Sequence, residues 1–205
     1  GYLHAKVDLE PVYNEKNRRV TAVYYLHEKE RYHISEFNLI TEDSVVGDIV
    51  LADSASSMIK VGMPFSVDGM EQERNRLTKI FKDKGYYRFQ KDYITFTADT
   101  THHSNKVKLT MNIAMTPASS GDSLVAHKEY RIGDVYYVTG AGMRFDETAL
   151  SKCDTLNYHG YNILYKENTI VRPGVLVENT FFQPGDIYSQ SNVDRTYNSF
   201  AQLTA

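Results

Sequence analysis

Two short segments of this chain occur twice, and this repetition limits the fold more than any other feature of the sequence. Tyr32-His33-Ile34-Ser35-Glu36-Phe37 recurs as Tyr130-Arg131-Ile132-Gly133-Asp134-Val135, and Gly62-Met63-Pro64-Phe65-Ser66 recurs as Gly185-Asp186-Ile187-Tyr188-Ser189. The first pair lies 98 residues apart (130 − 32) and the second 123 (185 − 62), so the later copy carries an insertion between its two segments. Self-similarity at a long period indicates one supersecondary unit used repeatedly. The sequence therefore favours small domains in series over one large enzyme fold.

Composition excludes several classes of protein. The chain has 205 residues, of which 41% are hydrophobic and 24% charged, as in a globular protein of one or two domains. The net charge is −3 and basic residues are scattered, which disfavours a nucleic-acid partner. No apolar run is long enough for a membrane-spanning helix, and Gly1 starts a strand-like pattern rather than a signal peptide. We therefore interpret the chain as an excised fragment. Cys153 is the only cysteine, so no intramolecular disulfide forms.

Alternating and helical periods predict a truncated unit followed by a complete one. Residues 1–29 alternate in two runs and are predicted to form the closing β-hairpin of an earlier unit. Residues 30–117 follow the order β-α-α-β-β, with the clearest helix from Asp68 to Lys84. Val45 to Val50 is predicted to extend the first strand or to form a short ordered loop, and Asp53 to Lys60 a short helix. Residues 118–129 are predicted to be a linker.

The last unit, residues 130–205, is predicted to contain the insertion at about 141–171. Tyr130 to Val138 should be its first strand, and residues 141–160 are polar and irregular. Tyr161 to Tyr165 could pair with Thr169 to Val171 in a small hairpin. Two helices should follow, one from Pro173 to about Phe182 and one after Ser189. By analogy with the middle unit, a closing hairpin is expected beyond Ala205.

These segments together resemble the tandem POTRA domains of BamA/TamA-like outer-membrane assembly proteins. The resemblance rests on Gly85-Tyr86-Tyr87 after a helix, on a closing hairpin, on Tyr-x-Ile at the start of the next unit, and on Gly-x-x-Phe/Tyr-Ser before the longer helix. It covers almost the whole chain. It implies an α+β fold in which each βααββ unit is a three-stranded mixed sheet with two helices on one face. It also implies a periplasmic location, no cofactor, and a C-terminal transmembrane barrel that this chain does not include.

The candidate contact surface is the strand Tyr93, Ile94, Thr95, Phe96, Thr97, Ala98 and Asp99. The resemblance places this strand at the edge of the sheet, and the longer, more apolar run from Val107 to Met115 suits a central strand. An edge strand leaves backbone N–H and C=O groups unpaired, so it can accept a visiting strand. The alternative is that a loop protects this edge or that it contacts nothing. His4 to Glu10, the corresponding run in the first hairpin, carries more charge and is the poorer template.

Other chemistry has little support in the sequence. His102-His103 could attract a metal ion, but a solvated loop is favoured because too few other ligands lie nearby. No nucleophile motif or P-loop occurs, and Gly140-Ala141-Gly142 lacks the rest of a dinucleotide fingerprint. Most of the sixteen tyrosines are expected to pack in cores or at unit boundaries, for example Tyr24, Tyr86, Tyr136 and Tyr197. The alternative, that tyrosines form a recognition surface, applies to Tyr158 and Tyr161 in the insertion.

The predicted function is a non-catalytic periplasmic scaffold. It would receive unfolded outer-membrane β-barrel proteins and accessory assembly proteins by β-augmentation. The alternative is a structural spacer or docking arm of a secretion, translocation or cell-division system, without client binding.

Overall fold

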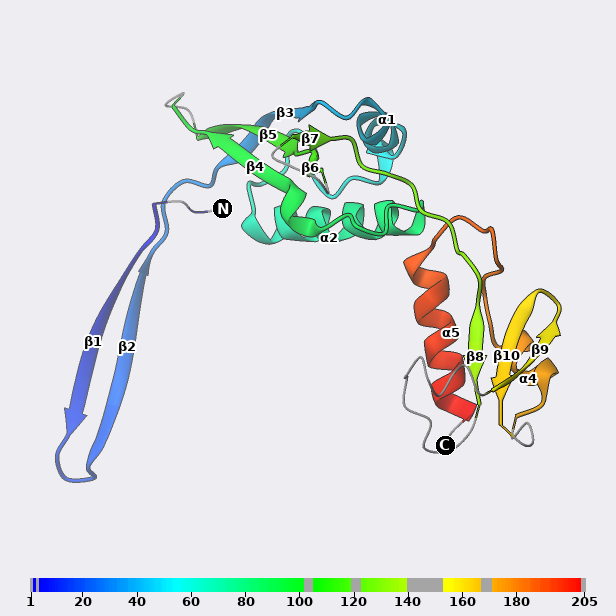
Figure 1. Ribbon diagram of the computed structural model, residues 1–205. Helices are drawn as coiled ribbons and strands as arrows, with labels where there is room; N and C mark the ends of the chain where they lie inside the picture. Colours follow the sequence, from blue (N-terminus) through cyan, green and yellow to red (C-terminus); the bar gives the residue numbers. More distant parts are fainter. Residues whose placement is uncertain are drawn as a thin grey trace. The chain divides into compact units, whose positions relative to one another are not determined.

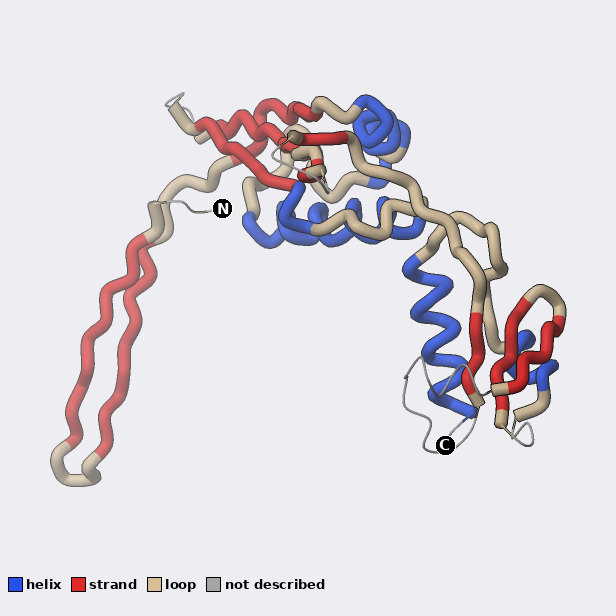
Figure 2. Tube along the Cα trace, in the orientation of Figure 1, coloured by secondary structure: helices blue, strands red, loops and turns tan. Residues whose placement is uncertain are grey.

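The computed structural model describes residue 2 and residues 4–101, 105–118, 123–139, 153–166 and 171–203. The chain divides into two compact units: Gly1–Arg76 with Gln90–Ala126, and Leu77–Phe89 with His127–Ala205. Both units combine helices with strands (Figures 1 and 2), which confirms the predicted α+β class. Gly140-Ala141-Gly142 and His102-His103 lie outside the described residues.

The first unit begins with the predicted hairpin. Strands β1 (Lys6–Asn14) and β2 (Arg19–His27) pair antiparallel, with Val7 opposite Leu26. One face of the hairpin is entirely apolar, and its members are Val7, Leu9, Pro11, Tyr13, Val20, Ala22, Tyr24 and Leu26. All eight are exposed.

A three-stranded mixed sheet follows, in the strand order β3-β5-β4. Strand β3 (His33–Thr41) runs parallel to the central strand β5 (Lys106–Ile113), and β4 (Ile94–Asp99) runs antiparallel to it. Between β3 and β4 lie α1 (Ser44–Ala52), the short 3₁₀ helix η1 (Ser54–Ser56), α2 (Val67–Asp83) and a second 3₁₀ turn, η2 (Lys91–Tyr93). The predicted β-α-α-β-β order is confirmed.

The apolar run from Val45 to Val50 is a helix, so neither a strand extension nor an ordered loop forms there. The side chain of Asp43 accepts a hydrogen bond from the backbone N–H of Val46 at 3.2 Å, which caps the first turn of α1. Val46 and Val50 are buried, while Val45 is exposed. The apolar residues of this segment therefore lie on different sides of a helix, a pattern that a short run of β-branched residues obscures.

The core of this unit lies between the sheet and the helices. Strand β5 contributes every second side chain to it, namely Val107, Leu109, Met111 and Ile113, each at most 3% exposed. Val107 and Leu109 form a cluster with Ile34, Ile59 and Phe65, and Met70 of α2 packs against this cluster. In Figure 1, α2 runs along the strands of this sheet. Each fully buried aliphatic side chain contributes about 1.5–3 kcal/mol to stability relative to an exposed one.

The predicted linker at 118–129 contains a small element of structure. Strand β7 (Leu124–Val125) pairs antiparallel with β6 (Thr116–Pro117). Ala118, the first residue of the predicted linker, donates its N–H to the carbonyl of Ser123 at 2.8 Å. A two-stranded ladder therefore closes this loop next to β5.

The second unit contains a three-stranded sheet with the order β8-β10-β9. Its strands are β8 (Tyr136–Val138), β9 (Asp154–Tyr158) and β10 (Tyr161–Tyr165), and its helices are α4 (Pro173–Glu178) and α5 (Gln190–Leu203). The first strand is shorter than predicted. The predicted pairing of Tyr161–Tyr165 with Thr169–Val171 is wrong, because β9 and β8 occupy the two sides of β10; residues 167–170 lie outside the described residues.

The turn between β9 and β10 explains this correction. His159 and Gly160 both have positive φ, 52° and 83°, as a two-residue type I′ hairpin turn requires. The turn joins the polar strand Asp154–Tyr158, which was predicted to be irregular, to β10. The second sheet thereby has the strand arrangement of the first, with a central strand parallel to the first strand and antiparallel to the outer one. The connectivity differs, because β9 and β10 precede α4 and α5 whereas β4 and β5 follow α1 and α2.

The repeated sequence segments form the same contacts in both units. In each, the tyrosine-containing segment and the glycine-containing segment exchange three backbone hydrogen bonds of 2.8–2.9 Å. In the first unit these are Ile34 N–H to Met63, Gly62 N–H to Ile34 and Phe65 N–H to Tyr32; in the second, Ile132 N–H to Asp186, Gly185 N–H to Ile132 and Tyr188 N–H to Tyr130. Gly62 and Gly185 have φ values of 89° and 90°, which explains the glycine in both copies. The two copies are therefore structurally equivalent.

Candidate functional site

The candidate site is the outer edge of β4. This strand pairs with β5 on one side only, and no strand in the described part of the chain pairs with its other side. Of the seven predicted residues, Ile94, Thr95, Phe96, Thr97, Ala98 and Asp99 form β4 itself. Tyr93 belongs to the 3₁₀ turn η2 instead, where its hydroxyl lies 3.1 Å from the hydroxyl of Thr116.

The direction of the β4 backbone groups follows from the ladder. Ala114 N–H donates to the carbonyl of Tyr93 at 2.9 Å, which makes these two residues a hydrogen-bonded pair. Hydrogen-bonded and non-hydrogen-bonded pairs alternate in an antiparallel ladder. Thr95 and Thr97 therefore direct their N–H and C=O groups toward β5. Phe96 and Ala98 direct both groups toward the open edge, where a visiting strand would find them. The carbonyl of Ile94 points the same way, but its N–H already donates to the carbonyl of Lys91.

A groove of about 270 Å³ runs beside this edge. It is lined by Val67, Met70, Glu71 and Arg74 of α2 and by Ile94, Thr95 and Phe96 of β4. Val67 is 67% exposed, and Met70 and Phe96 are half-buried. An extended segment that paired with β4 would place alternate side chains in this groove.

The helix wall of the groove carries fixed charges. The guanidinium of Arg74 donates to Glu71 at 3.0 Å, to Asp92 at 3.1 Å and to the Lys91 carbonyl at 3.1 Å. A hydrogen bond from Lys91 lowers the pKa of Glu71 below its ordinary value of 4.5, and the charges of Lys91 and Arg74 act in the same direction. The carboxylate therefore stays ionised near neutral pH. The wall is polar but its charges are mutually satisfied, so it sets no strong sign preference for a partner.

The far end of β4 is closed by a local turn. The carboxylate of Asp99 accepts hydrogen bonds from the Thr101 N–H at 2.9 Å and from the Thr101 hydroxyl at 2.7 Å. On the face opposite the helices, the Asn112 amide donates to the Thr97 hydroxyl at 3.2 Å. The exposed threonines are thus held in place by the sheet, and the edge they flank keeps a defined geometry.

Similarity to solved structures identifies the fold of this chain. No protein-family model matches the chain, and no curated protein sequence does. Among solved structures, the chain is similar to POTRA domains 3–5 of BamA from Haemophilus influenzae, with a TM-score of 0.51 and 12% identity over 99% of this chain. The fold is that of tandem POTRA domains. The chain spans 63% of the length of that structure.

Two further solved structures show weaker similarity. BamA from Haemophilus ducreyi lacking POTRA domains 1–3 matches 55% of this chain and 19% of its own length, with 20% identity and a TM-score of 0.38. POTRA domains 1–3 of Omp85 from Anabaena match 97% of this chain and 64% of their own length, with 12% identity and a TM-score of 0.26.

Sequence reasoning missed a second outer strand, β9 in the second POTRA unit. It forms one margin of the sheet β8-β10-β9, and four of its five residues are exposed. Its only aliphatic residue is Leu156, so its alternation is too weak to detect in the sequence. The hairpin strand β1 is also exposed throughout, but Lys6, Asp8 and Glu10 make it more charged than β4. Among these strands, β4 combines an open backbone edge with an adjoining groove.

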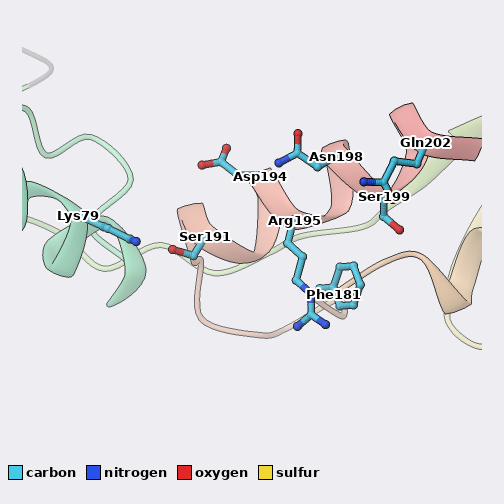
Figure 3. A pocket seen from close by; sticks show the side chains of 8 residues that line it. All are labelled: Lys79, Phe181, Ser191, Asp194, Arg195, Asn198, Ser199 and Gln202. Atoms are coloured by element: carbon cyan, nitrogen blue, oxygen red, sulfur yellow. The ribbon is translucent and has the colours of Figure 1, made fainter. Parts of the chain in front are cut away.

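A larger but polar groove lies along α5 of the second POTRA unit (Figure 3). It has a volume of about 500 Å³ and is lined by Lys79, Phe181, Ser191, Asp194, Arg195, Asn198, Ser199 and Gln202. In Figure 3 the side chains of Arg195 and Phe181 lie together, and the guanidinium is 3.7 Å from the centre of the ring. Asp194 accepts a hydrogen bond from Gln190 at 2.8 Å. The side chains of Arg195 and Asp194 are thus engaged with neighbours, and the Ser191 hydroxyl donates to the carboxylate of Asp83 at 2.7 Å.

The described residues contain no group of three His, Cys, Asp or Glu side chains placed to hold a metal ion. None of their helices combines the length and the apolar character needed to cross a bilayer. Tyr86 is buried, as predicted, whereas Tyr24, Tyr136 and Tyr197, which were also expected to pack, are 62%, 57% and 74% exposed. Tyr161, one of the two candidates for a recognition surface, is buried.

Proposed function

We propose that this chain is a non-catalytic periplasmic arm of an outer-membrane protein assembly machine. It receives unfolded β-barrel precursors and accessory assembly proteins by strand addition at β4. The observation that carries this proposal is the open edge of β4 beside the groove lined by Met70 and Phe96. The similarity to BamA POTRA domains supports it at the level of the fold.

Strand addition suits a client that is unfolded and variable in sequence. The outward N–H and C=O groups of Phe96 and Ala98, together with the Ile94 carbonyl, would bond to any extended backbone, so affinity comes from the main chain. The groove would add a preference for apolar residues at alternate positions, which is the pattern of a membrane-facing β-strand. Weak, sequence-tolerant binding of this kind lets one surface serve many precursors.

The proposal includes a division of the chain into repeated units. Residues 1–29 would be the closing hairpin of a preceding POTRA unit, and their exposed apolar face would pack on the helices of that unit. Residues 30–117 would be the complete unit, 118–129 a connection, and 130–205 a unit with the insertion at 141–171. A C-terminal transmembrane barrel would be attached beyond this chain.

Photo-crosslinking in living cells tests client binding. A photo-reactive amino acid at Thr95 or Thr97, on the strand that borders the groove, should crosslink to nascent outer-membrane barrel proteins. The same residue at Asn75, exposed on α2 and outside the lining of the groove, is the control and should give fewer such crosslinks. Crosslinks from Thr95 and Thr97 to fixed subunits alone, or to nothing, would instead support the docking-arm alternative.

A further inference from the structure

A tyrosine of the second unit fills a space that is empty in the first. The ring of Tyr137 on β8 lies against Tyr161 and Phe200, with ring centres 5.8 and 5.9 Å apart. Its hydroxyl forms a hydrogen bond with the hydroxyl of Thr180, in the segment that joins α4 to α5. Burial raises the pKa of Tyr137 above its ordinary value of 10, although the bond to Thr180 acts in the opposite direction. The ring therefore belongs to the interior of the second unit.

The repeat offsets identify the equivalent positions in the first unit. The offset of 98 places Leu39 at the position of Tyr137, and the offset of 123 places Ser57 at the position of Thr180. A polar side chain on the longer helix confirms this alignment. Glu73 accepts a hydrogen bond from the backbone N–H of Met58 at 2.9 Å, and Thr196 accepts one from the backbone N–H of Phe181 at 3.0 Å. Thr196 lies 123 residues after Glu73, and Phe181 lies 123 residues after Met58.

With leucine and serine at these positions, the first unit retains a pocket of about 220 Å³. Its apolar walls are Phe37 and Leu39 of β3, Met111 of β5, Val50 of α1 and Ile59. We call it the β3 pocket. Phe37 and Leu39 are only half-buried, whereas their partners on the central strand, Leu109 and Met111, are fully buried. The apolar interior is thus least covered beside β3, where the pocket lies.

The charged groups around the β3 pocket are already paired. The Glu73 carboxylate is 1% exposed and accepts two hydrogen bonds from Arg76, at 2.7 and 2.8 Å, besides that from Met58. Arg76 also bonds to Asp53. The pocket therefore demands no charge from an occupant. The Ser57 hydroxyl donates to the carbonyl of Ile59 and accepts its N–H, both at 3.1 Å, which leaves one lone pair of its oxygen for a phenol. A cavity of about 150 Å³ with apolar walls suffices for a benzene ring.

We propose that the β3 pocket receives an aromatic side chain from a partner polypeptide. An aromatic occupant is inferred because, in the second unit, the ring of Tyr137 lies at the equivalent position. The surroundings indicate a basic neighbour for this ring, because Glu42 and Asp48, before and on α1, are exposed acidic residues. Asp43 and Asp53 of the same segment are engaged by the Val46 N–H and by Arg76. Leu51 at 62% and Met58 at 49% exposure provide an apolar rim. This inference does not depend on strand addition at β4.

Titration with short peptides tests the proposal. The probe is the acetylated, amidated peptide Lys-Lys-Tyr-Lys-Lys, and the readout is methyl NMR of Met111, Ile59 and Val50. We expect saturable shifts at these methyl groups, with affinity at least about tenfold above that of the alanine-centred peptide, since the ring supplies the buried area. A glutamate-flanked tyrosine peptide should bind more weakly than the lysine-flanked one.

A substitution copied from the second unit supplies the specificity control. Leu39→Tyr should place a ring of the chain's own in the β3 pocket and abolish the shifts, whereas Ala98→Pro at the β4 edge should leave them unchanged. Equal binding of the alanine-centred peptide, binding that persists in a folded Leu39→Tyr protein, or no saturable shift would overturn the proposal. The peptide comparison on the unaltered protein decides the matter even where Leu39→Tyr does not fold.

Discussion

The carboxylate of Asp83, at the last residue of α2, caps the start of α5 through Ser191. It accepts the backbone N–H of Ser191 at 2.7 Å and the Ser191 hydroxyl at 2.7 Å, and the hydroxyl of Ser189 donates to it at 3.0 Å. The first N–H groups of a helix have no partner within the helix, and a negative charge there is favoured by the helix dipole. One side chain thus ties two helical segments, 108 residues apart in the sequence, within the second compact unit.

Removing this cap should destabilise the second unit. Asp83→Ala is expected to lower the free energy of unfolding by about 1–2 kcal/mol, as for other lost N-terminal caps, when measured by urea denaturation. Asp48→Ala, at an exposed position of α1, is the matched control and should change stability by less than about 0.5 kcal/mol. Equal effects of the two substitutions would show that the Asp83 contacts do not stabilise the unit.

The contribution of Asp83 should depend on pH. Burial raises the pKa of Asp83, but hydrogen bonds from Ser191 and Ser189 and the charge of Lys79 outweigh it, so the pKa lies below its ordinary value of 3.8. A lowered pKa in the folded state means that the stabilisation is complete above pH 3.8 and is lost as pH falls through the folded-state pKa. The stability difference between the unaltered protein and Asp83→Asn should therefore be constant from pH 7 to 5 and shrink below about pH 4. A difference that grows on acidification would contradict this assignment.

Gly85 should tolerate no side chain. It has a φ of 98°, and a Cβ there would lie 2.5 Å from the Glu129 side chain and 3.0 Å from that of Ile187. Gly185 has a similar φ of 90° but open space around it, so it isolates the backbone cost. Gly85→Ala should lower the melting temperature more than Gly185→Ala, which is expected to cost only about 1 kcal/mol. If the two losses are equal, the close packing at Gly85 is not significant.

The buried ion pair of the first unit should be sensitive to the loss of one partner. Glu73→Ala would leave Arg76 with Asp53 alone and remove the acceptor of the Met58 N–H, so we expect a loss of about 3 kcal/mol in unfolding free energy. Glu71→Ala on the exposed side of the same helix should cost under about 1 kcal/mol. A double-mutant cycle of Glu73 with Arg76 would measure their coupling, and additive effects would refute it.

Proline substitutions should separate strand addition from sheet stability. Ala98 directs its N–H outward, so Ala98→Pro should leave the ladder intact and change stability by under about 1 kcal/mol, yet reduce client crosslinking from Thr95. Thr97 directs its N–H toward β5, so Thr97→Pro should cost about 2 kcal/mol through the lost ladder bond. Unaltered crosslinking in a folded Ala98→Pro protein would argue against backbone recognition at this edge.

Much of the fold could be predicted from the sequence where periodicity was long. The alternation from Val107 to Ile113 and the helical stripe from Met70 to Phe81 each extend over several periods, and both elements form as expected. The repeated segments also form equivalent structures, because the backbone bonds at Gly62 and Gly185 require similar residues in both copies.

The remaining features depend on tertiary contacts that leave little trace in the sequence. Strand β9 is polar and was predicted to be irregular; it forms because β10 offers it a partner. The equivalence of Glu73 and Thr196 cannot be predicted from their residue types. It becomes evident only because a side-chain oxygen of each accepts a hydrogen bond from the backbone N–H at equivalent positions, Met58 and Phe181. The position of β4 at the edge was anticipated from the resemblance, but the groove beside it required the placement of Val67, Met70 and Arg74 on α2.

Amide hydrogen exchange at β4 tests the central claim most directly. The probe is a synthetic peptide with the sequence of one membrane-facing β-strand of an outer-membrane barrel protein, added to this protein in excess. Strand addition predicts that the amides of Phe96 and Ala98 become protected while those of Thr95 and Thr97, already bonded to β5, change little. Unchanged exchange at Phe96 and Ala98 under saturating peptide would contradict the proposed recognition at this edge.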